Sequence, residues 1–216
     1  MEKTVVTGIV LSATPVGDYD KRLVILTKEY GKISAFARGA RKPTGTLVAA
    51  ANPFACGQFE IYEGKSSYSI MSFNAKNYFR ELTADPEAAY YGFYFLEICD
   101  YYAREFGDER EMLSLLYSTL TTLSSKRIPF NLVRRIFELK VMWINGELPD
   151  TQQMKITDSD LVYTVNYILQ APINKLFLFM LTDELMGKLD RLADYYRAKI
   201  IDKRLNSLEI LETLIS

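Results

Sequence analysis

The spacing of apolar residues changes near residue 80, and this change limits what the chain can fold into. Before it, apolar side chains recur at every second position in short runs separated by Gly, Pro and polar residues; after residue 85 they recur at three- and four-residue steps. The first period is typical of half-buried strands and the second of amphipathic helices. We therefore predict an α+β chain of two domains, a five-stranded β-barrel at residues 1–80 and an all-α helical domain at 81–216.

The barrel prediction rests on five short apolar runs with no strong helix between them. In the first run, Val5, Thr7, Ile9 and Leu11 are expected on one face of the strand. The other expected strands are 23–27, 33–37, 59–62 and 68–73. A hairpin at 63–66 joins the last two, and one helical turn is expected at 49–51 within the long connection 39–56.

Five helices are expected in the second domain. The sequence 85–87 reads Asp-Pro-Glu, a cap followed by proline in the first turn, and apolar spacing then continues to about Phe106, before Gly107. The remaining helices begin at caps or breakers and have expected spans of 108–123, 129–146, 158–169 and 182–200. A polar connector occupies about 146–158.

The residue types present exclude several kinds of chemistry. The chain has no histidine and two cysteines, Cys56 and Cys99, which are far apart in sequence. Catalysis by Ser-His-Asp or Cys-His groups is therefore excluded, and so is a structural zinc site of Cys and His. No Gly-rich phosphate loop or dinucleotide-binding motif occurs. We predict a protein that is not an enzyme, with no catalytic residues, no metal, no cofactor and two reduced thiols.

No apolar run reaches the roughly 18 residues that a membrane span requires, and no signal-peptide pattern follows Met1. A cytoplasmic protein without a membrane partner is expected.

Charge is unevenly distributed along the chain. Residues 1–80 carry 11 Lys and Arg against 6 Asp and Glu, whereas 81–216 carry 15 against 21. Arg38, Arg41 and Lys42 lie together in a loop interrupted by Gly39 and Pro43, directly after the strand 33–37. Three cations in a loop beside a sheet suit a polyanion better than a small substrate.

Nucleic-acid binders that accept single strands combine a positive groove with aromatic rings on which bases stack. Phe36 is the ring best placed for this, because it alternates with Ile33, Ala35 and Ala37 and should face outward. The predicted binding residues are Lys21, Arg22, Lys32, Phe36, Arg38, Arg41 and Lys42. The other barrel cations, Lys65 and Lys76 among them, are more simply explained as solvated surface.

Seven aromatic residues crowd the first expected helix: Tyr90, Tyr91, Phe93, Tyr94, Phe95, Tyr101 and Tyr102. Two explanations stay open. The rings form a thick aromatic core, or some of them contact a partner's apolar segment.

Several of these segments resemble the RecO family of bacterial recombination mediators. The similar segments are 7–11, 18–23, 28–35, 37–43, 53–62 and 193–208, and they include the run Gly-Lys-Ile-Ser-Ala at 31–35 that precedes the basic loop. The resemblance implies an OB-fold barrel, binding of single- and double-stranded DNA without sequence preference, and annealing of complementary strands. It also implies work with RecR to load RecA onto DNA coated by single-stranded DNA-binding protein (SSB), and a nucleoid-associated location.

The resemblance implies two further features of the helical domain. The acidic and apolar tail of SSB would lie in an apolar slot beside a cation, for which Arg134, Lys140, Arg191 and Arg197 are candidates. Many family members carry a four-cysteine zinc site after the third long helix, but residues 146–158 contain no cysteine here. We expect a loop that folds without metal.

Three other functions are compatible with the sequence. An RNA-binding OB-fold protein would show the same barrel and cations, a protein adaptor would turn the basic loop toward an acidic partner, and a hydrolase would have to work with carboxylates alone.

Overall fold

The computed structural model describes residues 3–64 and 67–215. The chain forms two compact units. The barrel unit comprises Met1–Ala84 and Leu96–Leu113, and the helical unit comprises Asp85–Phe95 and Ser114–Ser216. Two long helices, α2 (Pro86–Tyr102) and α3 (Arg110–Ser125), contribute residues to both.

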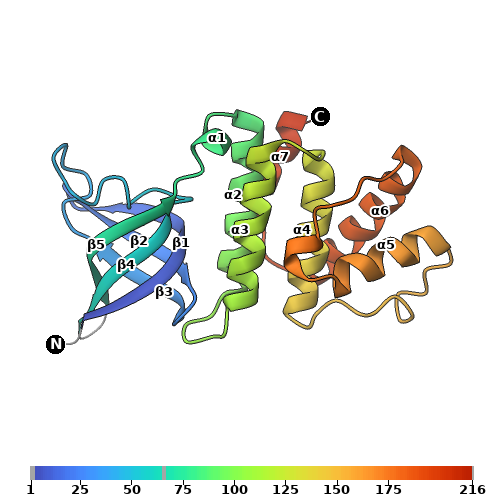
Figure 1. Ribbon diagram of the computed structural model, residues 1–216, viewed down its shortest axis with the longest axis horizontal. Coiled ribbons are helices and arrows are strands. Elements are labelled where there is room, and N and C mark those ends of the chain that lie inside the picture. Colours follow the sequence, from blue (N-terminus) through green and yellow to red (C-terminus); the bar gives the residue numbers. More distant parts are fainter. Residues whose placement is uncertain (1–2, 65–66, 216) are drawn as a thin grey trace. The chain divides into compact units, whose positions relative to one another are not determined.

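Five strands close the predicted barrel, in the spatial order β1-β2-β3-β5-β4 (Figure 1). Parallel pairing occurs between β3 and β5, where Phe36 lies opposite Ser69, and the other pairs are antiparallel. This topology is the OB-fold, so the fold class is confirmed. The strands are β1 (Lys3–Val16), β2 (Asp20–Thr27), β3 (Gly31–Ala37), β4 (Cys56–Glu63) and β5 (Tyr68–Asn77). The expected hairpin includes Lys65 and Ser66, which lie outside the described residues.

The barrel interior follows the predicted alternation in β3, where Ile33, Ala35 and Ala37 are buried and Phe36 is half-buried on the opposite side. In β1 the interior residues come from the face opposite to that of Val5 and Thr7. Val5 is 54% exposed, whereas Val6 belongs to the interior cluster. Ile9 and Leu11 are buried as well, so both faces of β1 carry apolar residues and alternation alone does not reveal which face lies inside the barrel.

The chain leaves α2 at Tyr102, four residues before the expected end at Phe106. Residues 103–109, here called the return segment, turn back to β3. Lys32 N donates to Arg104 O and Phe106 N donates to Tyr30 O, each over 2.9 Å. The helix prediction was wrong here because these backbone groups pair with the start of a strand rather than with the preceding helical turn. Gly31 permits this approach, since a Cβ there would collide with the Arg104 carbonyl oxygen.

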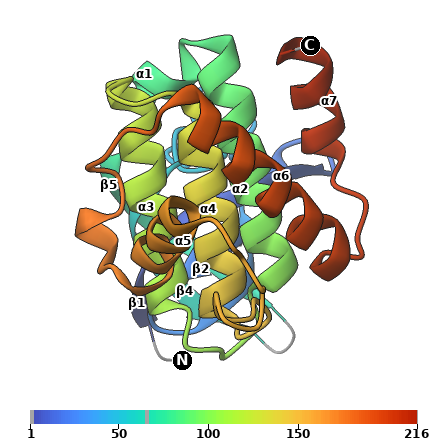
Figure 2. The ribbon, with the colours of Figure 1, turned by 90° about the vertical axis from the view of Figure 1, so that its right-hand side faces the viewer.

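In the helical unit α4 (Phe130–Ile144), α5 (Ser159–Gln170) and α6 (Asp183–Ile200) pack against one another (Figure 2). The cap expected at the start of α6 is present, since the Thr182 hydroxyl accepts from Leu185 N. The Asp158 carboxylate also caps α5, because it accepts from two of its backbone N–H groups. Three short elements were not predicted: α1 (Arg80–Thr83), a 3₁₀ turn (Ile173–Lys175) and α7 (Asn206–Ile215). Within the described ranges, no helix combines the length and hydropathy needed to cross a bilayer.

The aromatic residues of α2 favour the core explanation. Tyr91, Tyr94 and Phe95 are at most 2% exposed, and the Phe95 ring centroid lies 4.4 Å from that of Phe137. Phe93 is the exception, at 41% exposed.

Buried charges lie beside these rings. The Glu138 carboxylate is 0% exposed and accepts hydrogen bonds from Tyr94 Oη (2.5 Å), Arg134 Nε (2.9 Å) and Arg135 Nη1 (2.8 Å). Arg135 also pairs with Asp194 on α6. The interior carboxylate of Glu138 is therefore paired with two guanidinium groups. The Tyr94 hydroxyl connects this group to α2, and the Arg135–Asp194 pair connects it to α6.

The connector 146–158 does not supply the ligands of a structural zinc site, because it contains neither Cys nor His. Apolar burial and hydrogen bonds close it instead. Leu148 is 4% exposed, and Thr151 Oγ1 bonds to Asn166 Oδ1 over 2.9 Å. An ion pair of 2.7 Å between Asp158 and Lys188 ties its end to α6.

Candidate nucleic-acid interface

The three loop cations lie beside the turn between β1 and β2. Arg41 N donates to Tyr19 O and Arg41 Nη1 donates to Gly17 O, both over 2.8 Å. Gly39 N donates to the Asp20 carboxylate over 2.8 Å. Although the loop has no regular secondary structure, these bonds fix its position. We call residues 17–19 and 38–42 the basic edge.

The basic edge also presents an aromatic ring to solvent. Tyr19 is 56% exposed, and the ammonium of Lys42 lies 5.0 Å from its ring centroid. This distance is within the range of a cation–π contact. Arg38 and Arg41 are exposed on the same loop. The edge therefore offers cations and a stacking surface together.

Lys21 has a different position from the other candidates. It is half-buried in β2, and its Nζ donates to Ala51 O over 2.7 Å and to Asn52 Oδ1 over 3.3 Å. These bonds hold the long 39–56 connection, in which Ala51 N bonds to Leu47 O as one helical turn. Lys21 therefore has a structural role in addition to the binding role predicted for it.

Arg22, Lys32 and Phe36 lie on the outer face of β2 and β3. Arg22 lies opposite Phe36 in the register of the two strands, and Arg22 Nε donates to Ser34 Oγ over 2.7 Å. This face of an OB-fold is the one that commonly binds oligonucleotides. The predicted residues thus fall into two groups, the basic edge and the β2–β3 face.

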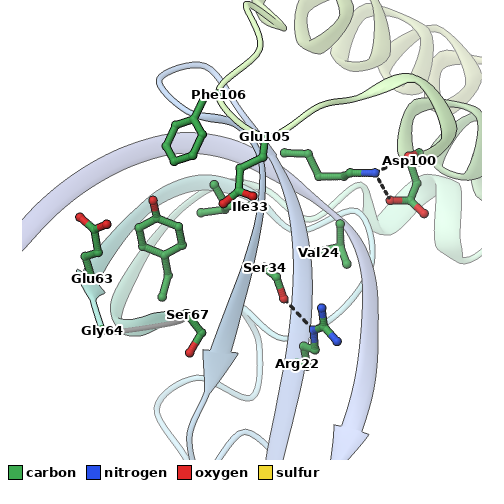
Figure 3. A pocket seen from close by; sticks show the side chains of 12 residues that line it. Arg22, Val24, Ile33, Ser34, Glu63, Gly64, Ser67, Asp100, Glu105 and Phe106 are labelled. Carbon is green, nitrogen blue, oxygen red and sulfur yellow. Dashed lines mark hydrogen bonds and ion pairs between the residues drawn. The ribbon is translucent and has the colours of Figure 1, made fainter.

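A hollow of about 610 Å³ lies on the β2–β3 face (Figure 3). Its described lining comes from the two strands, from both sides of the β4–β5 connection, and from residues near or in the return segment: Arg22, Val24, Lys32, Ile33, Ser34, Glu63, Gly64, Ser67, Tyr68, Asp100, Glu105 and Phe106. The charge of Lys32 is already engaged, since Nζ donates to Asp100 O over 2.6 Å and to Asp100 Oδ1 over 3.2 Å.

Sequence reasoning missed the residues that the return segment brings to this hollow. Phe106 is 69% exposed, and its ring contacts Tyr30 edge-on with centroids 6.4 Å apart. Tyr68 contributes a phenol whose pKa is raised by burial and then by the carboxylates of Glu63 and Glu105. The helical spacing continues through Phe106, so the sequence contains no signal that the chain turns back to the barrel.

The four predicted partner-binding cations differ in accessibility. Arg134 is 2% exposed, and Lys140 is 4% exposed with Nζ donating to Leu169 O and Ala171 O. Arg197 is partly buried beside Asp194, whereas Arg191 is exposed. None of the four lines the apolar groove of about 370 Å³ between α5 and α6, which is formed by Asp160, Tyr163, Thr164, Tyr167, Phe179, Met180, Leu181 and Leu185.

Comparison with known proteins identifies the family. Residues 1–79 match the family model "Recombination protein O N terminal", and residues 83–161 match "Recombination protein O C terminal". The chain belongs to the RecO family. The resemblance stated from the sequence is therefore confirmed, and the first match covers all five strands.

Relatives from three bacteria, each named DNA repair protein RecO, illustrate the similarity. Identity is 34% to the protein of Alkaliphilus metalliredigens, over 66% of this chain and 58% of the relative. It is 32% for Caldicellulosiruptor bescii, over 71% and 63%, and 24% for Acetivibrio thermocellus, over 96% of both chains. The chain thus spans less than two thirds of the length of the first two relatives.

Among the described residues, no group of three or more His, Cys, Asp or Glu side chains is arranged to hold a metal ion.

Proposed function

We propose that this RecO-family chain is a DNA-repair protein that acts as a recombination mediator. It binds single- and double-stranded DNA without sequence preference and anneals complementary strands. With RecR it helps to load RecA onto single-stranded DNA coated by SSB. It does so without making or breaking covalent bonds, and it requires no cofactor.

The observation that carries this proposal is the basic edge of an OB-fold barrel. Arg38, Arg41 and Lys42 are exposed beside the ring of Tyr19, at the turn between β1 and β2. OB-folds use this turn and the adjacent β2–β3 face to bind oligonucleotides. Phosphate contacts from these cations supply affinity that does not depend on base order.

Annealing follows from the same charges. Two DNA strands repel each other through their phosphates, and cations placed between them reduce this repulsion. Since the contacts are made to the backbone, the bases stay available to search for their complements.

The partner contacts belong to the helical unit in this proposal. An acidic, apolar SSB tail requires an accessible cation, and burial leaves Arg191 and Arg197 as the candidates that a partner can reach. Titrating a tail peptide against the Arg191→Glu and Arg197→Glu variants tests each residue. Unchanged affinity in both variants would contradict this assignment.

Strand annealing on SSB-coated DNA tests the proposed function. The charge reversal R38E/R41E/K42E should abolish most of the annealing rate, because it replaces phosphate attraction by repulsion at the basic edge. Annealing at the wild-type rate would contradict the proposal.

A matched control places the same change of net charge on the helical unit. Lys175, Lys199 and Lys203 are all exposed there, and the K175E/K199E/K203E variant should retain most of the activity. Equal losses in both variants would show that net charge, rather than the basic edge, controls annealing. Competition between matched DNA and RNA strands separates this function from RNA binding.

A further inference from the structure

Phe106 has an unusual backbone conformation. Its φ is 58°, in the left-handed region that bulky side chains rarely adopt. Phe106 N donates a hydrogen bond to Tyr30 O. The preceding residue, Glu105, forms an antiparallel β-bridge with Gly31. Surrounding bonds therefore hold a strained residue in place, and such strain is concentrated at functional sites.

In this backbone conformation the Phe106 ring lies at the surface rather than in the core. Phe106 is 69% exposed at the rim of the hollow, and Figure 3 shows it beside Glu105 on the return segment above β3. The rings of Tyr30 and Tyr68 are stacked next to it, with centroids 6.3 Å apart and planes inclined by 13°. An exposed aromatic ring supported by other rings is suited to stacking on a flat ligand.

The hollow has two chemically different ends. Glu63, Tyr68, Glu105 and Phe106 form an acidic and aromatic end. Arg22 lies toward the other end, exposed and oriented by its hydrogen bond to Ser34. The carboxylates repel phosphate but accept hydrogen bonds from amino groups, whereas Arg22 attracts phosphate.

We propose that this hollow holds one unpaired nucleotide of a bound DNA strand, with the base stacked on Phe106 and its phosphate beside Arg22. The carboxylates of Glu105 and Glu63 accept a hydrogen bond from the exocyclic amino group of the base. A volume of about 610 Å³ is within the range of small-ligand sites. The inference rests on the proposed function, since it places one base of a strand whose other phosphates follow the basic edge.

This arrangement adds a modest base preference at one position to backbone contacts that do not depend on sequence. Cytosine presents an amino group to the carboxylates, but thymine presents a carbonyl oxygen at the corresponding edge. Short oligonucleotides of deoxycytidine should bind several-fold more tightly than those of thymidine. Glu105→Gln should reduce this difference, because an amide can donate to thymine as well as accept from cytosine.

The role of the ring is tested by three substitutions. Phe106→Ala and Phe106→Leu should each weaken oligonucleotide binding about fivefold or more, whereas Phe106→Trp should retain it. The slope of log affinity against log salt should stay constant in all three, because stacking releases no counterions. Met71→Ala, which removes an apolar side chain that is 53% exposed on β5, serves as the control and should bind as wild type.

Phe106→Gly separates binding from folding. Glycine adopts a positive φ without strain, so this variant should unfold at the same or a higher temperature than wild type and still bind weakly. Wild-type affinity in Phe106→Leu would overturn the inference, and so would equal affinity for cytidine and thymidine strands. The proposed function would still stand in either case if R38E/R41E/K42E loses binding. Failure of wild type to bind any oligonucleotide would instead overturn the proposed function.

Discussion

The Nη1 atom of Arg41 donates a hydrogen bond to the carbonyl oxygen of Gly17 over 2.8 Å. This bond connects the loop after β3 to the turn between β1 and β2, across 24 residues of sequence. It places cations from one segment beside the exposed ring of Tyr19 from the other. Two segments that are distant in sequence thereby form one surface that carries cations and an aromatic ring.

Arg41→Lys tests whether this positioning affects binding. The substitution keeps the charge but removes the guanidinium that reaches Gly17, so single-stranded DNA affinity should fall a few-fold with little change in its salt slope. Fluorescence anisotropy over a range of salt concentrations measures both quantities. Wild-type affinity in this variant would show that the bond to Gly17 has no role in binding.

Asp100→Asn should strengthen DNA binding. Its carboxylate pairs with Lys32 on the β2–β3 face at 3.2 Å, and removing the negative charge leaves that ammonium available to a phosphate. The salt slope should then increase by about 0.7, the contribution of one phosphate contact on a single strand.

Asp108→Asn is the control for this prediction, since it removes an equal charge from an exposed pair with Arg110 in the same unit. Equal effects of the two substitutions would attribute the gain to net charge alone.

Glu138→Gln should destabilise the protein strongly. The substitution leaves the interior guanidinium groups of Arg134 and Arg135 without their buried counter-charge, and breaking such a pair costs about 3–5 kcal/mol. Urea denaturation measures the free energy of unfolding. Glu209→Gln, at an exposed pair with Arg204, should leave it nearly unchanged. A small loss at Glu138 would mean that the network contributes little to stability.

Lowering the pH should destabilise the wild-type protein partly because the Glu138 carboxylate becomes protonated. Burial alone would raise the pKa of Glu138, but the charges of Arg134 and Arg135 hold it below the usual value. With the pKa lowered in the folded state, the stabilisation is complete above the unfolded pKa of about 4.3 and is lost as pH falls through the folded pKa. Between neutral pH and pH 3, the free energy of unfolding should decline less in Glu138→Gln than in wild type. An equal decline in both proteins would contradict a role of Glu138 in the acid sensitivity.

Both thiols should be unreactive in the folded protein. Cys56 and Cys99 are free and buried, and burial raises the pKa of Cys56 to about 11 and that of Cys99 further above its usual range. Because the thiolate is the reactive form, alkylation at pH 8 should occur only after denaturant is added. Mass spectrometry of alkylated peptides measures this, and rapid labelling of native Cys99 would contradict its burial.

Sequence periodicity predicted the barrel and the long helices because each depends on local spacing. The residues of β3 alternate as expected, and the helices expected to begin near Asp158 and Thr182 do begin there. At β1 both faces carry apolar residues, so spacing alone did not reveal that Val6 rather than Val5 faces the interior. The register shift after Val10 was not expected either, because it depends on pairing with β2.

The candidate site was predictable only in part. Clustering in sequence identified Arg38, Arg41 and Lys42, and alternation identified the outward position of Phe36. Phe106 was missed because its place depends on backbone bonds between residues 104–106 and 30–32, which lie far away in sequence. The interior positions of Arg134 and Lys140 were likewise hidden, since a charged residue on a helix is ordinarily exposed.

The salt dependence of single-stranded DNA binding tests the central claim most directly, because it counts phosphate contacts. With R38E/R41E/K42E the slope of log affinity against log salt should fall by about 2, from three lost contacts of about 0.7 each. K175E/K199E/K203E should keep the wild-type slope. An unchanged slope of log affinity against log salt in R38E/R41E/K42E would contradict the claim that these cations contact DNA phosphates.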